Sequence, residues 1–144
     1  MAANTRFAVG VHLMTSLAYT GGTHTSEELA ASVVTNAVVL RRILARLEKA
    51  GLVTGHPGRR GGFALARPAS AITLLDVHRA VGGDGLFAVH ANREARSCPV
   101  SACIKGVLAD VFEKAEGAAE GELKRVRLAD VVARVPAPPG RKKL

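Results

Sequence analysis

The N-terminal third of the chain combines apolar positions at helical spacing with a helix-start signal. Four apolar residues recur every three or four positions and end at a glycine pair, which predicts a helix over residues 6–20; they are Phe7, Val11, Met14 and Leu17. Thr25 and Glu28 have the spacing of a capping box, in which the hydroxyl and the carboxylate each accept a hydrogen bond from a backbone amide at the helix start. The sequence therefore predicts a second, short helix over residues 26–33.

A third helix is predicted after a short break. Thr35 or Asn36 can cap it, and Gly51 ends it. Its apolar residues form a single stripe, made of Leu40, Ile43, Leu44 and Leu47. Two short helices joined by a tight turn are typical of the helix-turn-helix, a motif that binds duplex DNA.

The periodicity changes after Gly51. Residues 52–54 and 63–65 are short strand-like runs on either side of a glycine-rich segment, residues 56–62. This pattern predicts a β-hairpin whose tip carries Arg59 and Arg60. A basic hairpin that follows a helix-turn-helix is the wing of a winged helix-turn-helix domain.

Beyond the hairpin, a capped helix is predicted from Thr73 to Val81, and residues 82–97 have no clear period and are expected to form a loop. A long amphipathic helix is expected from Ala102. Gly117 and Gly121 each weaken a helix by about 1 kcal/mol relative to alanine, so we expect a bend or early fraying there. The apolar stripe of this helix would be exposed on a monomer, which predicts a dimer interface. Its residues are Ile104, Val107, Leu108, Val111 and Phe112.

These elements predict a mostly α fold with a small β-hairpin. We expect a winged helix-turn-helix domain in residues 1–82, a sensor or connecting loop in 83–101, a dimerisation helix region in 102–133 and a basic disordered tail in 134–144. No apolar run approaches the ~20 residues that span a bilayer, and the N-terminus lacks the layout of a signal peptide. The sequence thus predicts a cytoplasmic protein without a membrane partner.

The net charge of +8 is concentrated in two segments, with +5 in residues 36–60 and +4 in residues 134–144. On the third helix, Arg42, Arg46 and Lys49 are spaced by four and three residues, away from the apolar stripe, and Glu48 is the only acid. Aromatic residues make up only 3% of the chain, which argues against stacking on unpaired bases and favours duplex DNA as the partner.

A basic helix and a basic hairpin tip held by one core suit a duplex, because the helix can enter the major groove while the wing touches the backbone or the minor groove. The first turn of the helix reaches deepest, so the candidates for base contact are Thr35, Asn36, Val38 and Val39. The candidates for the remaining DNA contacts are Arg41, Arg42, Arg46, Arg59 and Arg60. Thr35 or Asn36 can instead serve only as the helix cap, and the arginines only as a solvated face.

Three segments in order carry a family resemblance: residues 36–53, 58–68 and 72–81. They closely resemble the Rrf2 family of winged-helix regulators, whose members include the iron–sulfur cluster assembly repressor and nitric-oxide-sensing repressors. The resemblance extends over about residues 6–132. It implies a sequence-specific transcriptional repressor, held as a homodimer by the long helix, that binds a pseudo-palindromic operator with one recognition helix in each half-site.

Family members with an iron–sulfur cluster resemble one another in a group of three cysteines before the dimer helix, whereas this chain has only Cys98 and Cys103. A cluster here would need other metal ligands, such as His90 or His12 of the partner subunit. Three interpretations stay open: inert or structural thiols with no cofactor, which we favour, a thiol or disulfide sensor, and a cluster with mixed ligands. Both cysteines are near a helix start, where the helix dipole lowers a thiol pKa, and this gives the sensor a physical basis.

Two other functions are weighed against a regulator. A non-specific architectural protein would share the basic surface but show little sequence preference. A thiol-based redox enzyme would use Cys98, but residues 58–62 lack the Lys-Ser/Thr of a phosphate-binding loop and the chain has no HExxH motif. The sequence therefore favours a DNA-binding regulator that is not an enzyme and that responds to a redox or small-molecule effector.

Overall fold

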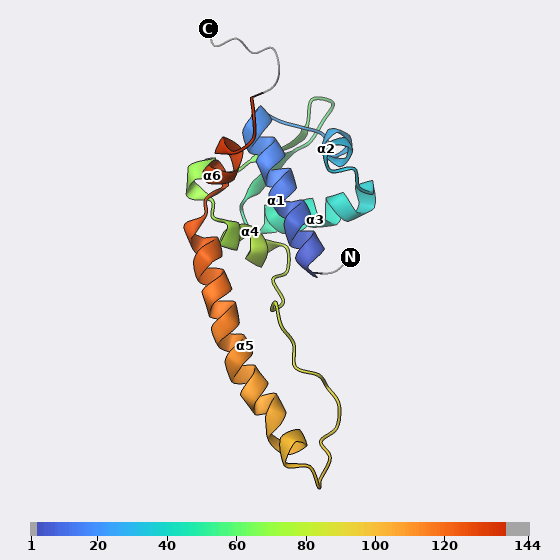
Figure 1. Ribbon diagram of the computed structural model, residues 1–144. Coiled ribbons are helices and arrows are strands. Elements are labelled where there is room, and N and C mark those ends of the chain that lie inside the picture. Colours follow the sequence, from blue (N-terminus) through green and yellow to red (C-terminus); the bar gives the residue numbers. More distant parts are fainter. Residues whose placement is uncertain (1–2, 138–144) are drawn as a thin grey trace.

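The computed structural model describes residues 3–137. In these residues six α-helices and one hairpin follow one another (Figure 1). They are α1 (Ala3–Thr20), α2 (Ser26–Val33), α3 (Ala37–Lys49), β1 (Val53–His56), β2 (Gly62–Leu65), a 3-10 turn (Ala69–Ala71), α4 (Leu74–Ala80), α5 (Pro99–Arg125) and α6 (Leu128–Ala133). The prediction of a mostly α fold with a small antiparallel hairpin and a long C-terminal helix is confirmed.

The core lies where α1 crosses α2, α3 and α4. The stripe predicted on the third helix is buried, with each of its four leucine and isoleucine side chains no more than 2% exposed. Leu13, Met14 and Leu17 of α1 pack into the same cluster. Burying a side chain of this size stabilises a fold by roughly 1.5–3 kcal/mol, so the apolar stripes fix how α1 and α3 cross.

Local capping sets the start of α2 and α3. The Thr25 hydroxyl accepts from the Glu28 amide at 3.2 Å, and the Thr25 amide donates to the Glu28 carboxylate at 2.9 Å, so the predicted capping box is confirmed. Of the two residues that could cap the third helix, Asn36 does so: its Oδ1 accepts from the Val38 amide at 2.7 Å. The direction of α3 is therefore fixed at its first turn.

The hairpin pairs β1 with β2 in antiparallel register, from Val53 opposite Leu65 to His56 opposite Gly62. It is tied to the helix-turn-helix by His24, which exchanges two backbone hydrogen bonds with Phe63, at 2.9 and 2.7 Å. This bridge attaches the second strand of the wing to the chain just before α2.

Helix α5 extends away from the rest of the fold, and the irregular chain from residue 82 to residue 98 runs along it (Figure 1). The helix begins at Pro99 rather than at residue 102, because proline is well suited to a first helical turn. The expected early fraying at Gly117 and Gly121 is wrong, since the helix continues through both to Arg125. The loss of about 1 kcal/mol at each glycine is too small to stop a helix of 27 residues.

The last described helix, α6, was not predicted from the sequence. The chain turns after α5, and Leu128 is fully buried in the core. Backbone bonds join Leu74 to Val126 at 2.9 Å and Leu128 to Ile72 at 2.8 Å. Residues 126–133 therefore pack on the winged domain, within the segment predicted to be the dimerisation helix region.

The first residues of the predicted disordered tail follow α6 and lie beside α1. The Tyr19 hydroxyl donates to the Pro136 carbonyl at 2.9 Å, which fixes the chain just after α6 against α1. The rest of the predicted tail, residues 138–144, lies outside the described residues. None of the helices within residues 3–137 combines the length and the apolar character that crossing a membrane requires.

Candidate nucleic-acid interface

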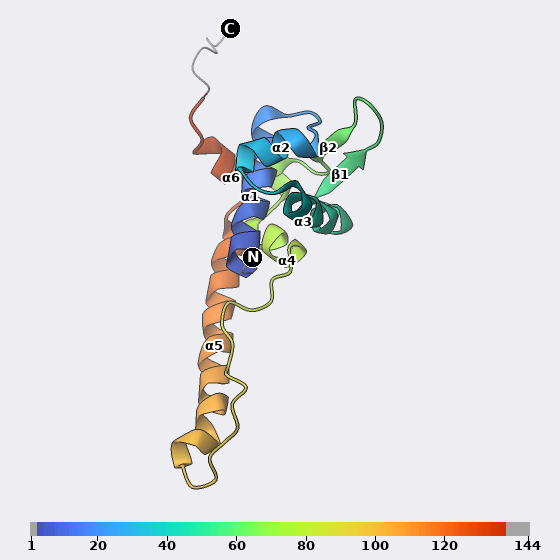
Figure 2. The same ribbon diagram turned by 90° about the vertical axis from the view of Figure 1, so that its right-hand side faces the viewer.

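The third helix and the hairpin lie on the side of the molecule that is turned away from α5 (Figure 2). Each of the two elements carries some of the basic residues that are predicted to contact DNA. The buried stripe of α3 holds that helix on the core, and the His24 bridge holds the hairpin beside it. The two cationic elements thus have a fixed relative position.

The four candidates for base contact differ in exposure. Val38 is 55% exposed on the first turn of α3, and Asn36 is also exposed. Thr35 is half-buried, and Val39 packs against the core. Because the Asn36 Oδ1 is already bonded to the Val38 amide, only its NH₂ group remains free to donate. The most accessible apolar group of this turn is therefore the Val38 side chain.

The arginines of α3 have different partners. The Arg42 side chain is exposed. Arg41 forms an ion pair with Glu27 of α2 at 3.2 Å. The pKa of Glu27 is lowered mainly because its carboxylate accepts hydrogen bonds from the Glu27 backbone amide and the Ser26 hydroxyl. Arg41 adds a smaller effect in the same direction. Arg46 donates from Nη1 to the Val81 carbonyl at 2.6 Å, which joins the recognition helix to the end of α4.

The hairpin tip presents Arg59 and Arg60, both exposed, on a turn that only glycine can form. Gly58 has φ +104°, a region that side-chain-bearing residues rarely adopt. A Cβ on Gly61 would lie 2.0 Å from the His56 carbonyl oxygen. The glycines therefore fold the tip tightly enough to place two adjacent cations at its end.

The turn of the helix-turn-helix contains a strained residue. Val34 has φ 56° and ψ 52°, the left-handed conformation, and its side chain is 88% exposed. A β-branched residue in this conformation is an outlier, at a cost of about 1–2 kcal/mol. The Val34 amide donates a hydrogen bond to the Ala30 carbonyl at the end of α2. The strained residue therefore lies between α2 and the segment proposed to contact bases, which begins at Thr35.

The predicted dimer stripe divides into two faces. Val107 and Val111 are 53% and 54% exposed. Val100, which lies two helical turns before Val107 on the same face, is 62% exposed. Phe112 instead stacks on Phe87 of the connecting loop, with ring centroids 5.2 Å apart. The other two predicted residues, Ile104 and Leu108, are half-buried. The valine face is therefore the open part of the predicted interface.

The two cysteines are free and exposed at the start of α5. Cys98 is the N-cap residue, and the Cys103 thiol donates to the Val100 carbonyl at 3.7 Å. His90 is exposed in the loop, whereas His12 lies on α1 within 3.4 Å of the Ser32 hydroxyl. Within residues 3–137, no three His, Cys, Asp or Glu side chains come together in a group that could hold a metal ion.

Sequence reasoning missed Arg6. This residue of α1 lines a hollow together with Val39, Arg42 and Arg46 of α3, so a third element adds a cation to the recognition helix. No sequence pattern connects Arg6 with these residues, because the contact depends on how α1 crosses α3.

The fold and the basic surface together define a winged helix-turn-helix DNA-binding protein. The profile of the Rrf2 family, described as iron-dependent transcriptional regulators, matches residues 3–134. The chain therefore belongs to the Rrf2 family of transcriptional regulators, and the predicted resemblance is confirmed.

Several known proteins are similar to the chain. It is 40% identical over 130 residues to YwnA of Bacillus subtilis, which is named as an HTH-type transcriptional regulator, and the match covers 90% of this chain and 96% of YwnA. A solved protein described as DNA-binding is 36% identical with TM-score 0.71, covering 88% and 97% of the two chains. IscR of T. potens is 26% identical with TM-score 0.67, covering 93% and 91%. Because the family and YwnA are described as transcriptional regulators, the comparison does not support the redox-enzyme alternative.

Proposed function

We propose that this chain binds a pseudo-palindromic operator as a homodimer and represses transcription. The observation that carries the proposal is the pair of cationic elements on one side of a rigid domain. Helix α3 exposes Val38 and Arg42, and the hairpin tip exposes Arg59 and Arg60. Because the domain holds the two elements at a fixed separation, a duplex can meet both without prior folding of the protein.

In this proposal the two elements have separate tasks. The first turn of α3 enters the major groove, where the Val38 methyl groups can meet a thymine methyl and the Asn36 NH₂ group can donate to a base edge. Arg42 and the hairpin arginines contact phosphates, which position the domain but carry no sequence information. Asn36 also holds the helix start, so its cap orients the very turn that reads the bases.

A second copy of the chain covers the valine face of α5. Two winged domains then lie on one side of the DNA with their recognition helices about one helical turn apart, roughly 34–36 Å. The spacing of the half-sites follows from how α5 pairs with its partner. Because the target is chromosomal DNA, we place the protein in the cytoplasm.

Salt-dependent binding tests the phosphate contacts. Arg59→Ala and Arg60→Ala are each expected to weaken binding to every duplex and to flatten the slope of log K against log[salt] by about one. Arg125→Ala, which removes an exposed arginine from α5, is the matched control and should change neither quantity. An unchanged slope in both hairpin variants, measured by fluorescence anisotropy, would contradict the assignment of the wing.

Base readout is tested on the first turn of α3. Val38→Ala should cost roughly 1–3 kcal/mol on the operator and little on random DNA. Asn36→Ser keeps a capping side chain but lacks the NH₂ group that donates to a base edge. We expect Asn36→Ser to lose affinity on the operator but not on random DNA, whereas Asn36→Ala, which also loses the cap, should weaken binding to both duplexes. Equal loss on both duplexes for Val38→Ala would favour the architectural, non-specific alternative.

The residues do not fit the iron–sulfur group that the family resemblance implies. The chain has two cysteines, and the described residues hold no group of three metal-ligating side chains. The only thiols are both exposed at the end of α5 that lies farthest from the winged domain (Figure 1). The proposed function therefore includes no bound cluster.

The thiols can instead act as the signal input. Two thiols oxidised by diamide lose two electrons and two protons and form a disulfide, which changes the junction of the loop with α5. We expect diamide to weaken operator binding, dithiothreitol to restore it, and Cys98→Ser to abolish the response without affecting the reduced protein. If the Cys98→Ser, Cys103→Ser double variant responds like the parent, the thiols are not the sensor and a small-molecule effector remains.

A further inference from the structure

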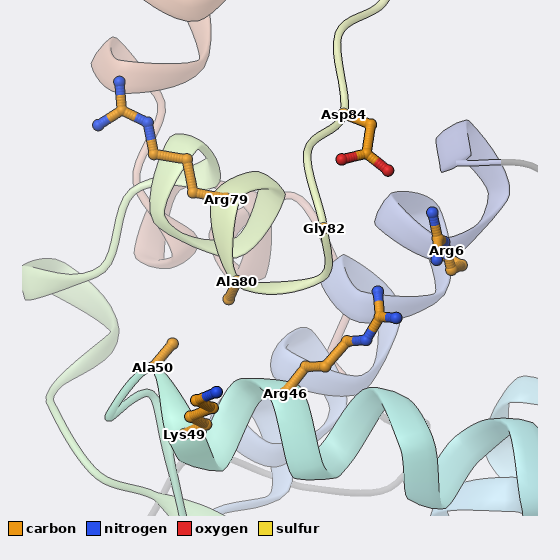
Figure 3. Close-up of a pocket in the computed structure, with 8 residues that line it drawn as sticks. All are labelled: Arg6, Arg46, Lys49, Ala50, Arg79, Ala80, Gly82 and Asp84. Carbon is orange, nitrogen blue, oxygen red and sulfur yellow. The ribbon is translucent and has the colours of Figure 1, made fainter.

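A hollow of about 450 Å³ lies between α1, α3 and the end of α4 (Figure 3). This volume is within the range of roughly 300–1,000 Å³ that is usual for small-ligand sites. Three basic side chains line it from two helices: Arg6 of α1, and Arg46 and Lys49 of α3. A fourth, Arg79, extends away from the hollow in Figure 3 and forms an ion pair with Glu120 of α5 at 3.2 Å.

The two arginines of the hollow lie close together. A Cβ on Gly82 would lie 2.6 Å from Nη1 of Arg46 and 4.0 Å from Nη2 of Arg6. Gly82 has φ +87°, a conformation that disfavours a side chain, so no side chain at this position lies beside the two guanidinium groups. Figure 3 shows both guanidinium groups on the same side of the hollow. Like charges this close repel each other, and an anion between them removes the repulsion.

The basic side chains of the hollow outnumber its single carboxylate. In the described part of the chain no ion pair involves Arg6, Arg46 or Lys49. The Nε of Arg6 is buried and has no hydrogen-bond partner there, although a buried N–H normally has one. Arg46 donates one N–H to the Val81 carbonyl and keeps other donors free. Asp84 is the only acid that lines the hollow.

We propose that Arg6, Arg46 and Lys49 form a binding site for an oxyanion of the phosphate class. Guanidinium groups bind such oxygens through two parallel hydrogen bonds, which a pair of converging arginines can offer from two sides. The anion joins α1 to the recognition helix, and through Arg46 to the end of α4. The phosphate belongs either to a small phosphorylated molecule or to the backbone of a bound duplex, and the second source rests on the proposed function.

The site is tested first without DNA, by titrating inorganic phosphate and pyrophosphate into the full chain. The readouts are calorimetry and the Nε–H NMR signals of the arginines. We expect the Arg6 signal to shift, Arg6→Gln to weaken binding at least ten-fold, Lys49→Gln to weaken it several-fold, and Asp84→Asn to strengthen it. Arg125→Gln is the control for a lost surface charge. Equal affinities in Arg6→Gln, Lys49→Gln and Arg125→Gln overturn the site.

The source of the phosphate is tested with DNA, using Arg6→Gln after circular dichroism has shown parental helix content. If the duplex supplies the phosphate, the variant lowers the salt slope of DNA binding by about one. If a free anion supplies the phosphate, Arg6→Gln leaves the salt slope of DNA binding unchanged but no longer binds inorganic phosphate. Either result supports the site. A failure of the proposed function would appear in the hairpin variants and leave the DNA-free titration intact.

Discussion

The winged domain and α5 differ in what covers their apolar side chains. Leu44 of α3 is fully buried within the chain itself, whereas none of the 27 residues of α5 is buried. Phe112 of α5 stacks on Phe87 of the loop, and Val107 and Val111 remain about half exposed. A helix in water depends mostly on packing of its apolar face. The winged domain therefore carries its own core, whereas α5 leaves its valine face open, where we propose that a second copy binds.

The largest effect should come from breaking the core of the winged domain. Leu44→Ala removes a side chain that is 0% exposed, and we expect it to lower the free energy of unfolding by about 2–5 kcal/mol. Chemical denaturation followed by circular dichroism measures the change. Because this core lies within one chain, the loss should be the same across a wide range of protein concentrations. A loss that vanishes at high concentration would show that the winged domain also depends on the partner.

A smaller effect, confined to assembly, is expected from the valine face of α5. Burying the exposed half of two valines stabilises the dimer by about 3 kcal/mol, so Val107→Glu with Val111→Glu should weaken dimerisation at least roughly a hundred-fold. Analytical ultracentrifugation measures it. Ala109→Glu is the control, because residue 109 is exposed on the opposite side of the helix from Val107. A dimer that survives the double change would place the interface on another surface.

The smallest effect concerns strain in the winged domain. Val34→Gly relieves a left-handed valine but gives the unfolded chain more freedom, so the net gain in the free energy of unfolding is about 1 kcal/mol. Thermal unfolding should shift upward accordingly. Val33→Gly is the matched control, since Val33 is helical and should instead lose stability. A lower melting temperature for Val34→Gly would show that the Val34 side chain makes a contact worth more than the strain.

Local sequence patterns predicted most of the fold and part of the site. The spacing of Leu40, Ile43, Leu44 and Leu47 gave the buried face of α3, and Thr25 with Glu28 gave the start of α2. The glycines around Arg59 and Arg60 predicted the position of the hairpin tip. Each of these features depends on residues only a few positions apart, whose geometry is set by the helix or strand that contains them.

Contacts between distant segments were decided only by the tertiary structure. Leu128 in α6 has a weak local pattern, and its burial depends on the chain returning to Ile72. Arg46 has the helical position of a DNA contact, yet its guanidinium binds Val81 and lies beside Arg6. Local spacing therefore predicts most of helices α1 to α5 and the apolar face of α3, but not helix α6. The neighbours of each charged side chain followed from how the helices cross, because charge interactions depend on distances between elements that no local spacing encodes.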